Sequence, residues 1–402
     1  MPFYKPLKAE SSATRKRTVA GLSALRDQFH KVKFPRKKTT ESLILGTWNI
    51  RNFDDDRFDY GPREEESFYY LAEIISWFDV IAVQEINEDL WPLKKLMGVL
   101  GGHYDYLLTD VTHSGLGGNA ERLGFIYDTN KVDFQGVAGE IVLPRKLLIG
   151  EDDQLQFSRT PFGVEFESGW FKFMFSTVHI FFGSNAAGDA KYRRRVGEIE
   201  AVAKYLAEEA RNSDANQILV GDFNIIKPGG VESNALENNG FTTIKNRLGS
   251  NRDQTKFYDQ ISFMSRRNEL RLIGQPPATE PVAGQDPELP DRVLQYFDSV
   301  YRDDQFDTYK PIMVKRLEEK IKESEKVLKD DKASKSAKAK ATTRIKSKQK
   351  AMASEAALKK YYDEWRTFQM SDHLPLWIEL EIDFTDAYLK YLSNWNPKDD
   401  EV

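Results

Sequence analysis

Acids, amides and imidazoles recur at the ends of apolar runs in this 402-residue chain. The chain has five histidines, and two follow this pattern, His179 in "TVHIF" and His373 in "SDHLPLW". The motifs "TWNIR", "VQEIN", "VGDFN" and "YDQI" add Asn49, Glu85, Asp222, Asn224 and Asp259. Carboxylate and amide oxygens are the ligands that Mg²⁺ or Mn²⁺ prefers, and imidazoles exchange protons near neutral pH. The combination is typical of metal-assisted hydrolysis of a phosphate ester.

Each of these residues also has a structural explanation when it is taken alone. Asn49 and the two polar residues of "GDFN" could form turns, because Asn and Asp favour turns. Glu85 could be solvated at a strand end. His179 could be a core imidazole with a hydrogen-bond partner, and Asp259 could pair with a backbone group. The functional interpretation therefore requires a fold that brings them together.

The hydrophobic pattern predicts the elements that would position these residues. Strands are expected over residues 43–50, 78–85, 122–128, 162–167, 171–180, 217–223, 257–264 and 374–382. Helices are expected over 63–76, 88–98 and, most clearly, 190–212. Strands mixed with helices favour an α/β fold, and the consecutive strands favour mixed or stacked sheets. Each polar motif is then expected at the carboxyl end of a strand or beside one, where ligands of α/β sheets bind.

The charge of the chain is unevenly distributed. The net charge is -5, yet residues 1–40 carry 11 Lys/Arg against 2 Asp/Glu, and residues 310–360 carry 17 against 7. The rest of the chain is therefore strongly acidic. An acidic body suits divalent cations, and basic segments suit polyanions, so nucleic acid is an expected partner of both basic segments. Both could instead be solvated, and the second could pack on a protein partner or another subunit.

The composition excludes several classes of protein. The chain has no cysteine, so disulfides and thiolate metal sites are absent. No stretch approaches the roughly 20 apolar residues that span a bilayer, and the N-terminus lacks the apolar segment of a secretion signal. We therefore expect a cytoplasmic protein without a membrane partner.

Composition also suggests the domain organisation. Residues 1–40 are a basic N-terminal segment, residues 41–385 the main domain and residues 386–402 an acidic tail. Residues 265–365 interrupt the domain with a Pro-rich loop and then a basic helical hairpin. This charged arm leaves the core just after Asp259 and returns just before Asp372, so its base is expected at the rim of the site.

The ordered motifs "TWNIR", "QE", "ERLGFIYD", "FSRTPF", "TVHIF", "GDFN", "YDQI" and "SDHLPLW" resemble the endonuclease/exonuclease/phosphatase superfamily, the deoxyribonuclease I-like fold. The resemblance covers residues 43–264 and 366–384. It implies a four-layer α/β sandwich, in which two mixed β-sheets are flanked by helices, here with the charged arm inserted. The implied activity is that of a Mg²⁺- or Mn²⁺-dependent nuclease. A phosphomonoesterase, a phospholipase-type enzyme and an inactive scaffold are the alternatives.

The resemblance also implies a role for each residue. Asn49 and Glu85 would hold the cation, with Asp372 contributing to it or to a second one. Asp222 would activate water, Asn224 would bind the scissile phosphate, and His373, oriented by Asp259, would act as an acid/base group. Glu121 would pair with His179, and Arg159 would reach a phosphate oxygen. Asn87 departs from the deoxyribonuclease I branch, which has a DNA-gripping arginine at this position.

Overall fold

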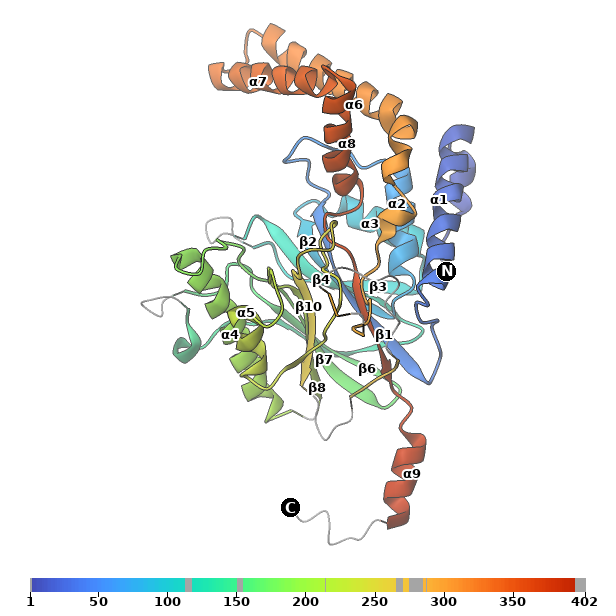
Figure 1. Ribbon diagram of the computed structural model, residues 1–402, viewed down its shortest axis with the longest axis vertical. Coiled ribbons are helices and arrows are strands. Elements are labelled where there is room, and N and C mark those ends of the chain that lie inside the picture. Colours follow the sequence, from blue (N-terminus) through green and yellow to red (C-terminus); the bar gives the residue numbers. More distant parts are fainter. Residues whose placement is uncertain are drawn as a thin grey trace.

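Two six-stranded mixed sheets pack face to face in the computed structural model, which describes residues 2–112, 118–149, 155–213, 215–264, 270–274, 285–286 and 288–394. The first sheet has the order β11-β12-β1-β2-β4-β3, and the second has the order β5-β6-β7-β8-β10-β9. Figure 1 shows α4 and α5 on one side of the sheets and α1, α2 and α3 towards the other. The predicted sandwich of two mixed sheets flanked by helices is confirmed.

The strands of the first sheet are β1 (Ser42–Phe53), β2 (Val80–Asn87), β3 (Tyr104–Leu108), β4 (Glu121–Asp128), β11 (Arg271–Leu272) and β12 (Leu376–Glu381). Those of the second are β5 (Asp133–Glu140), β6 (Phe162–Ser168), β7 (Phe171–His179), β8 (Asn216–Asp222), β9 (Thr242–Thr243) and β10 (Asp259–Met264). The α-helices are α1 (Ser12–Lys31), α2 (Glu65–Ile75), α3 (Trp91–Leu100), α4 (Ala190–Ala210), α5 (Val231–Glu237), α6 (Phe306–Lys329), α7 (Lys335–Met352), α8 (Glu355–Gln369) and α9 (Thr385–Asn394).

The central strands are the apolar runs of the sequence because both of their faces are buried. β1 pairs in parallel with β2, and β7 pairs in parallel with β8. Side chains such as Val83, Phe125, Phe175 and Val220 belong to one core shared by the two sheets. A second core lies under α4 and α5. The edge strands β3 and β5 were not expected, because β3 is mostly half-buried and β5 is largely exposed, so neither has the apolar run of a central strand.

The N-terminal segment is packed on the body rather than flanking it loosely. α1 is 20 residues long, and its Leu22, Leu25 and Phe29 are buried in the main core. Arg17 and Arg26 form ion pairs with two glutamates of α2, Glu66 and Glu73. Part of the positive charge of residues 1–40 is therefore neutralised within the protein, and the basic N-terminal segment contains a helix docked on the main domain.

The charged arm consists of three helices instead of the predicted hairpin of two. α6 and α7 project from the body, and α8 returns towards β12 (Figure 1). Residues 293–301, which lie within the predicted insertion, belong to the body, since Tyr296 and Tyr301 are fully buried. Residues 275–284 and 287 of the Pro-rich loop, and residues 395–402 of the acidic tail, lie outside the described residues. Within the described ranges, no helix is both long and apolar enough to cross a bilayer.

Candidate active site

The polar motifs meet at one edge of the two sheets. Asn49, Glu85, His179 and Asp222 lie at or near the carboxyl ends of β1, β2, β7 and β8, as expected. Glu121 and Asp259 instead begin their strands. β4 runs antiparallel to β2 and β10 runs antiparallel to β8, with Asn87 opposite Glu121 and Asp222 opposite Asp259. The start of an antiparallel strand therefore reaches the same edge as the end of its neighbour.

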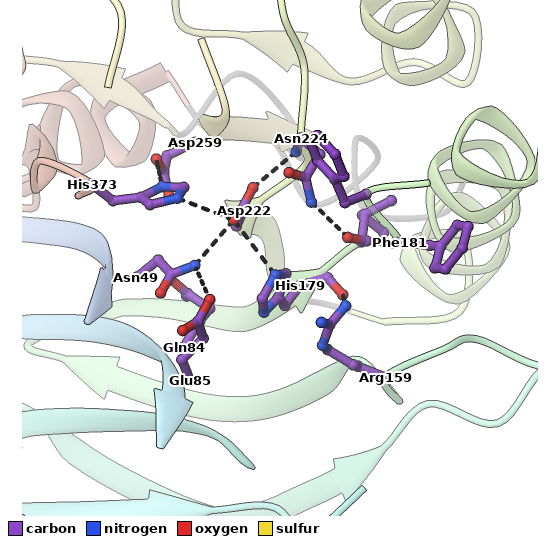
Figure 2. A network of polar contacts seen from close by, with 12 residues as sticks. Asn49, Gln84, Glu85, Arg159, His179, Phe181, Asp222, Asn224, Asp259 and His373 are labelled. Atoms are coloured by element: carbon purple, nitrogen blue, oxygen red, sulfur yellow. Dashed lines mark hydrogen bonds and ion pairs between the residues drawn. The ribbon is translucent and has the colours of Figure 1, made fainter. Parts of the chain in front are cut away.

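Asp222 lies at the centre of this group (Figure 2). Its Oδ2 accepts a hydrogen bond from Asn49 Nδ2 at 3.0 Å and lies 3.6 Å from His179 Nε2 and 3.7 Å from His373 Nε2. Its Oδ1 accepts a hydrogen bond from the backbone N–H of Asn224 at 2.9 Å. The side chain is almost fully buried, at 2% exposure. One carboxylate is thus shared by an amide and two imidazoles.

His373 is held in its charged form by two aspartates. Its Nδ1 lies 2.8 Å from Asp259 Oδ2, and its Nε2 faces Asp222. Burial disfavours the imidazolium, but the carboxylates of Asp259 and Asp222 outweigh burial and raise the pKa of His373 well above its ordinary value. His373 therefore carries a proton at neutral pH, with Nδ1 directed at Asp259 and Nε2 directed into the site.

His179 has the opposite protonation state. Its Nδ1 lies 3.3 Å from Glu121 Oε1, so the predicted Glu121–His179 pair is present in the structure. Burial and the Arg159 guanidinium lower the pKa of His179 to about 4, against the pull of Asp222 and Glu85. His179 is therefore neutral where His373 is charged. Two imidazoles with separated pKa values are typical of a site in which one group donates a proton and the other only orients or binds.

Arg159 contacts protein groups in this structure, whereas the resemblance implied a phosphate contact. Its guanidinium forms an ion pair with Glu121, and Nη1 donates to the carbonyl oxygen of His179 at 3.4 Å. The side chain is buried, and it forms the wall of the site behind His179 (Figure 2). Contact with a phosphate oxygen would need this ion pair to rearrange.

Glu85 is aimed into the site by an unusual backbone. Its φ is +62°, in the left-handed region, at a point where the register of β2 shifts against both β1 and β4. Its Oε2 accepts from the backbone N–H of Asn52 at 2.7 Å and its Oε1 from Asn49 Nδ2 at 3.1 Å. Burial opposes ionisation, but His179, which is itself charged at low pH, together with these two donors lowers the pKa of Glu85 to about 2.

Two further backbone features place Asp222 and Asn224. Gly221 has a φ of +131°, and a Cβ added to it would lie 2.1 Å from the carbonyl oxygen of Val178. Glycine allows this close approach of β8 to β7, which makes His179 and Asp222 register partners. Asn224 follows with a φ of +56°, and its Nδ2 donates to the carbonyl oxygen of Ile180 at 2.7 Å. Backbone strain of this kind gathers at functional sites.

The residues present fit a hard divalent cation. Asn49 Oδ1 is buried and has no hydrogen-bond partner among the described residues, and it lies beside the ionised Glu85. Ligand atoms of Glu85, Glu121 and His179 lie within 4.8 Å of one another. Asp222, Asp259 and His373 form a second such group. Oxygen donors predominate, which suits Mg²⁺ or Mn²⁺.

Asp372 lies beside these groups rather than in either of them. It is half-buried, and its charge is among those that raise the pKa of His373. Its carbonyl oxygen accepts from the backbone N–H of Arg252 at 2.8 Å. The position suits an electrostatic influence on His373, and the predicted role of Asp372 as a metal ligand remains a prediction.

Two residues that support the site were missed in the sequence. Ser371 Oγ accepts from the backbone N–H groups of Arg51 and His373 and donates to the carbonyl oxygen of Asn49 at 2.6 Å. The Tyr296 hydroxyl lies 2.6 Å and 2.9 Å from the carbonyl oxygens of Ser371 and His373. Ser371 adjoins the "SDH" motif, which was a usable signal, whereas Tyr296 falls in a stretch predicted to be an insertion.

A guanidinium lies beside Asn87. Arg57, from the loop after β1, donates through Nη2 to Asn87 Oδ1 at 2.9 Å and to the carbonyl oxygen of Asn119 at 3.1 Å. Both Arg57 and Asn87 line an open cavity of about 450 Å³, together with the carboxylates of Asp54, Asp55, Asp56, Glu88 and Asp89.

The comparisons with known proteins identify a family for the chain. The model of the Endonuclease/Exonuclease/phosphatase family matches residues 46–293. No curated protein matches the sequence. Among solved structures, an endonuclease/exonuclease/phosphatase family protein from Bacteroides thetaiotaomicron has a TM-score of 0.48 and 16% identity, covering 85% of this chain and 98% of that chain.

Two further structures show similar relationships at the level of the fold. A mannosyl-6-phosphatase from Bacteroides thetaiotaomicron has a TM-score of 0.45 and 18% identity, covering 62% of this chain and 96% of its own. The human Nocturnin catalytic domain with bound sulfate has a TM-score of 0.43 and 13% identity, covering 58% of this chain and 84% of its own. With the family model matching more than half of the chain, the protein belongs to the endonuclease/exonuclease/phosphatase family, whose members act on phosphate esters.

Proposed function

We propose that the protein is a divalent-metal-dependent phosphodiesterase, and specifically a nuclease that hydrolyses DNA or RNA. One observation carries the proposal: Asp222 lies 3.6 Å from a neutral imidazole and 3.7 Å from a charged one. This arrangement supplies a base and an acid within a few ångströms of each other, which is what attack by water on a phosphodiester requires.

In the proposed reaction, Asp222 accepts a proton from water as the water oxygen bonds to phosphorus. The bond between phosphorus and the leaving oxygen breaks, and His373 donates its Nε2 proton to that oxygen. Asp259, 2.8 Å from His373 Nδ1, keeps the imidazolium charged before the step. The proton held by Asp222 then passes to His373, directly or through a solvent molecule, which restores the starting state.

The remaining residues bind and orient the substrate. Asn224, whose backbone N–H donates to Asp222, would bind a non-bridging oxygen of the phosphate through the Nδ2 hydrogen that is not donated to the carbonyl oxygen of Ile180. Asn49 and Glu85 would hold the divalent cation, which when bound would offset the charge that develops on the phosphate. His179, neutral and fixed against Glu121, would donate a hydrogen bond without changing its charge.

One feature favours a diester of nucleic acid as the substrate. The basic arm is joined to the site directly, because α8 ends at Gln369, three residues before Asp372. A basic segment at this position suits an extended polyanion better than a small phosphomonoester. The open cavity at Arg57 adds no such support, because five carboxylates also line it, those of Asp54, Asp55, Asp56, Glu88 and Asp89.

A substrate panel tests the proposal. Plasmid DNA, single-stranded DNA, RNA, bis-p-nitrophenyl phosphate, p-nitrophenyl phosphate and a phospholipid are incubated with Mg²⁺ or Mn²⁺, with and without chelator. We expect metal-dependent cleavage of a nucleic acid and of the aryl diester. Asp222→Asn and His373→Ala should each lose roughly 10²–10⁴-fold in kcat/KM. Asp253→Asn, on an exposed carboxylate, is the matched control. Preferred turnover of the monoester or the phospholipid would refute the assignment as a nuclease.

A further inference from the structure

Helix α7 is basic along its whole length. Its 18 residues include seven Lys/Arg and no Asp/Glu. Several cations are four residues apart, such as Lys340 with Arg344 and Lys346 with Lys350, and like charges at this spacing destabilise a helix. Only Ala341 and Lys348 of the helix are buried, so burial of apolar surface offers little in return. A helix of this composition is poised to gain stability from an external anion.

Asp59 pairs with three cations of the arm, and Asp56 and Glu64 of the body pair with Lys320 and Arg316 of α6. Asp59, in the loop after β1, pairs with Lys320 of α6 at 2.8 Å and with Arg344 and Lys348 of α7 at 2.6 Å and 2.7 Å. The side chains of Lys320 and Lys348 are each only 6% exposed. These three cations therefore hold the arm in place and are not available to a ligand.

Four other lysines of α7 face solvent. Lys335, Lys340, Lys346 and Lys350 are exposed, and within the part of the chain that the structure describes they form no ion pair. The neighbouring α6 does not neutralise them, because it has seven Lys/Arg and five Asp/Glu of its own. The excess positive charge of the arm is thus concentrated on the exposed side of α7.

The arm is connected to the active site by short, well-packed contacts. α8 leads from α7 to the segment that contains His373, and Tyr362 and Trp365 of α8 are buried in the main core. Arg51, two residues after Asn49, donates to Thr367 and lies 3.5 Å from Glu364, both on α8. The position of α7 relative to the site is therefore set by packed structure, and α7 stands out from the body at the end of this support (Figure 1).

We propose that α7 is an accessory binding surface for the sugar-phosphate backbone of a polynucleotide. The inference rests on the proposed function, since a phosphodiesterase site at the foot of the arm makes nucleic acid the polyanion that fits. An α-helix rises 1.5 Å per residue, so 18 residues span about 27 Å, the length of roughly eight nucleotides at 3.4 Å each. The surface should therefore distinguish long strands from short ones.

Binding is tested first, in chelator, so that no strand is cut. Fluorescence anisotropy of labelled 5- and 30-nucleotide DNA is compared for the wild type, for K335Q/K340Q/K346Q/K350Q and for the control K146Q/K204Q/K245Q/K390Q. The control removes four exposed lysines from other surfaces. We expect the α7 variant to bind the 30-mer at least tenfold more weakly at low salt. The slope of log K against log salt should become shallower by about 3, because each phosphate contact contributes roughly 0.7–0.9 to the slope and four lysines are replaced.

Catalysis then separates this inference from the proposed function. In the α7 variant, the ratio of activity on long DNA to activity on bis-p-nitrophenyl phosphate should fall at least tenfold, while circular dichroism and Tm confirm the fold. Asp222→Asn should lose hydrolysis of both substrates and keep its affinity for the 30-mer in chelator. If the wild type binds the 30-mer in a salt-dependent way but cleaves no nucleic acid, the proposed function is refuted and the inference about α7 is not.

Three results would overturn the inference itself. The first is an α7 variant with the affinity and salt slope of the wild type. The second is an equal loss of affinity in the control variant. The third is binding of the wild type to phosphatidylserine vesicles, lost in the α7 variant, without binding to DNA or RNA, which would assign the surface to an anionic membrane.

Discussion

Replacing Asp259 with asparagine should move the pH dependence of hydrolysis to lower pH. In the wild type, the pKa of His373 is raised, so the imidazolium persists above pH 6.5 and is lost as the pH rises through the raised value. The substituted amide would keep a hydrogen-bonding oxygen near His373 Nδ1 but would remove the negative charge. A hydrogen bond to a charged group contributes about 1.5–3 kcal/mol, and one pKa unit corresponds to 1.36 kcal/mol. The alkaline limb of kcat/KM should therefore move down by about one to two pH units.

The assay is the hydrolysis of bis-p-nitrophenyl phosphate at saturating Mg²⁺ from pH 5 to 10. A parallel NMR titration of the His373 ring reports its protonation without depending on catalysis. Asp372→Asn is the matched control, because its carboxylate also influences His373 but is half-buried and makes no hydrogen bond to the ring in the described structure. This control should shift the limb by less than Asp259→Asn does.

The same substitution should change stability in a defined pH window. A raised pKa in the folded state means that the charged His373 stabilises the fold fully below its unfolded pKa, near 6.5, and that this contribution disappears as the pH rises through the folded pKa. Asp259→Asn should therefore be most destabilising at acidic pH. If the limb stays in place or moves to higher pH in the variant, the assignment of His373 as the proton donor is incorrect.

Three other substitutions probe the metal, the arm and the backbone. Glu85→Gln should weaken Mn²⁺ binding at least tenfold in calorimetry, because it removes a carboxylate beside Asn49 that the fold keeps ionised down to about pH 2. Asp59→Asn removes the carboxylate that Lys320, Arg344 and Lys348 share and should lower the free energy of unfolding in urea by about 2 kcal/mol, less than for a fully buried pair. Gly221→Ala places a Cβ 2.1 Å from a carbonyl oxygen and should cost more than about 3 kcal/mol, with a lower Tm than Gly188→Ala, which meets no atom within 4 Å.

The central part of the fold was predictable because its strands are buried on both faces. β1, β2, β7 and β8 appear in the sequence as apolar runs, and their polar ends stand out against them. The edge strands β3 and β5 lack that contrast. Asp259 was identified from the motif "YDQI", whereas Glu121 was identified only through the resemblance. Nothing local shows that an antiparallel strand begins at the edge where its neighbour ends, as both residues do.

Contacts between residues far apart in the sequence could not be predicted from local sequence patterns. Tyr296 supports the segment of His373 across 77 residues through backbone carbonyls, and Asp59 holds Lys348 across 289 residues. The ion pair of Arg159 with Glu121 could not be read from the sequence either, and the phosphate contact that the resemblance implies for Arg159 remains a prediction. The helices of the arm were predictable from their spacing, whereas the docking of α1 and the anchoring of the arm depend on tertiary packing.

The site is divided between the two sheets and the last segment before β12, and this has a consequence for the nascent chain. Asn49, Glu85 and Glu121 come from one sheet, and His179, Asp222 and Asp259 from the other. His373 is translated 114 residues after Asp259. A chain still on the ribosome at α6 holds every carboxylate of the two candidate metal groups but lacks His373, the proposed proton donor. The proposed hydrolysis therefore requires that synthesis has passed the arm.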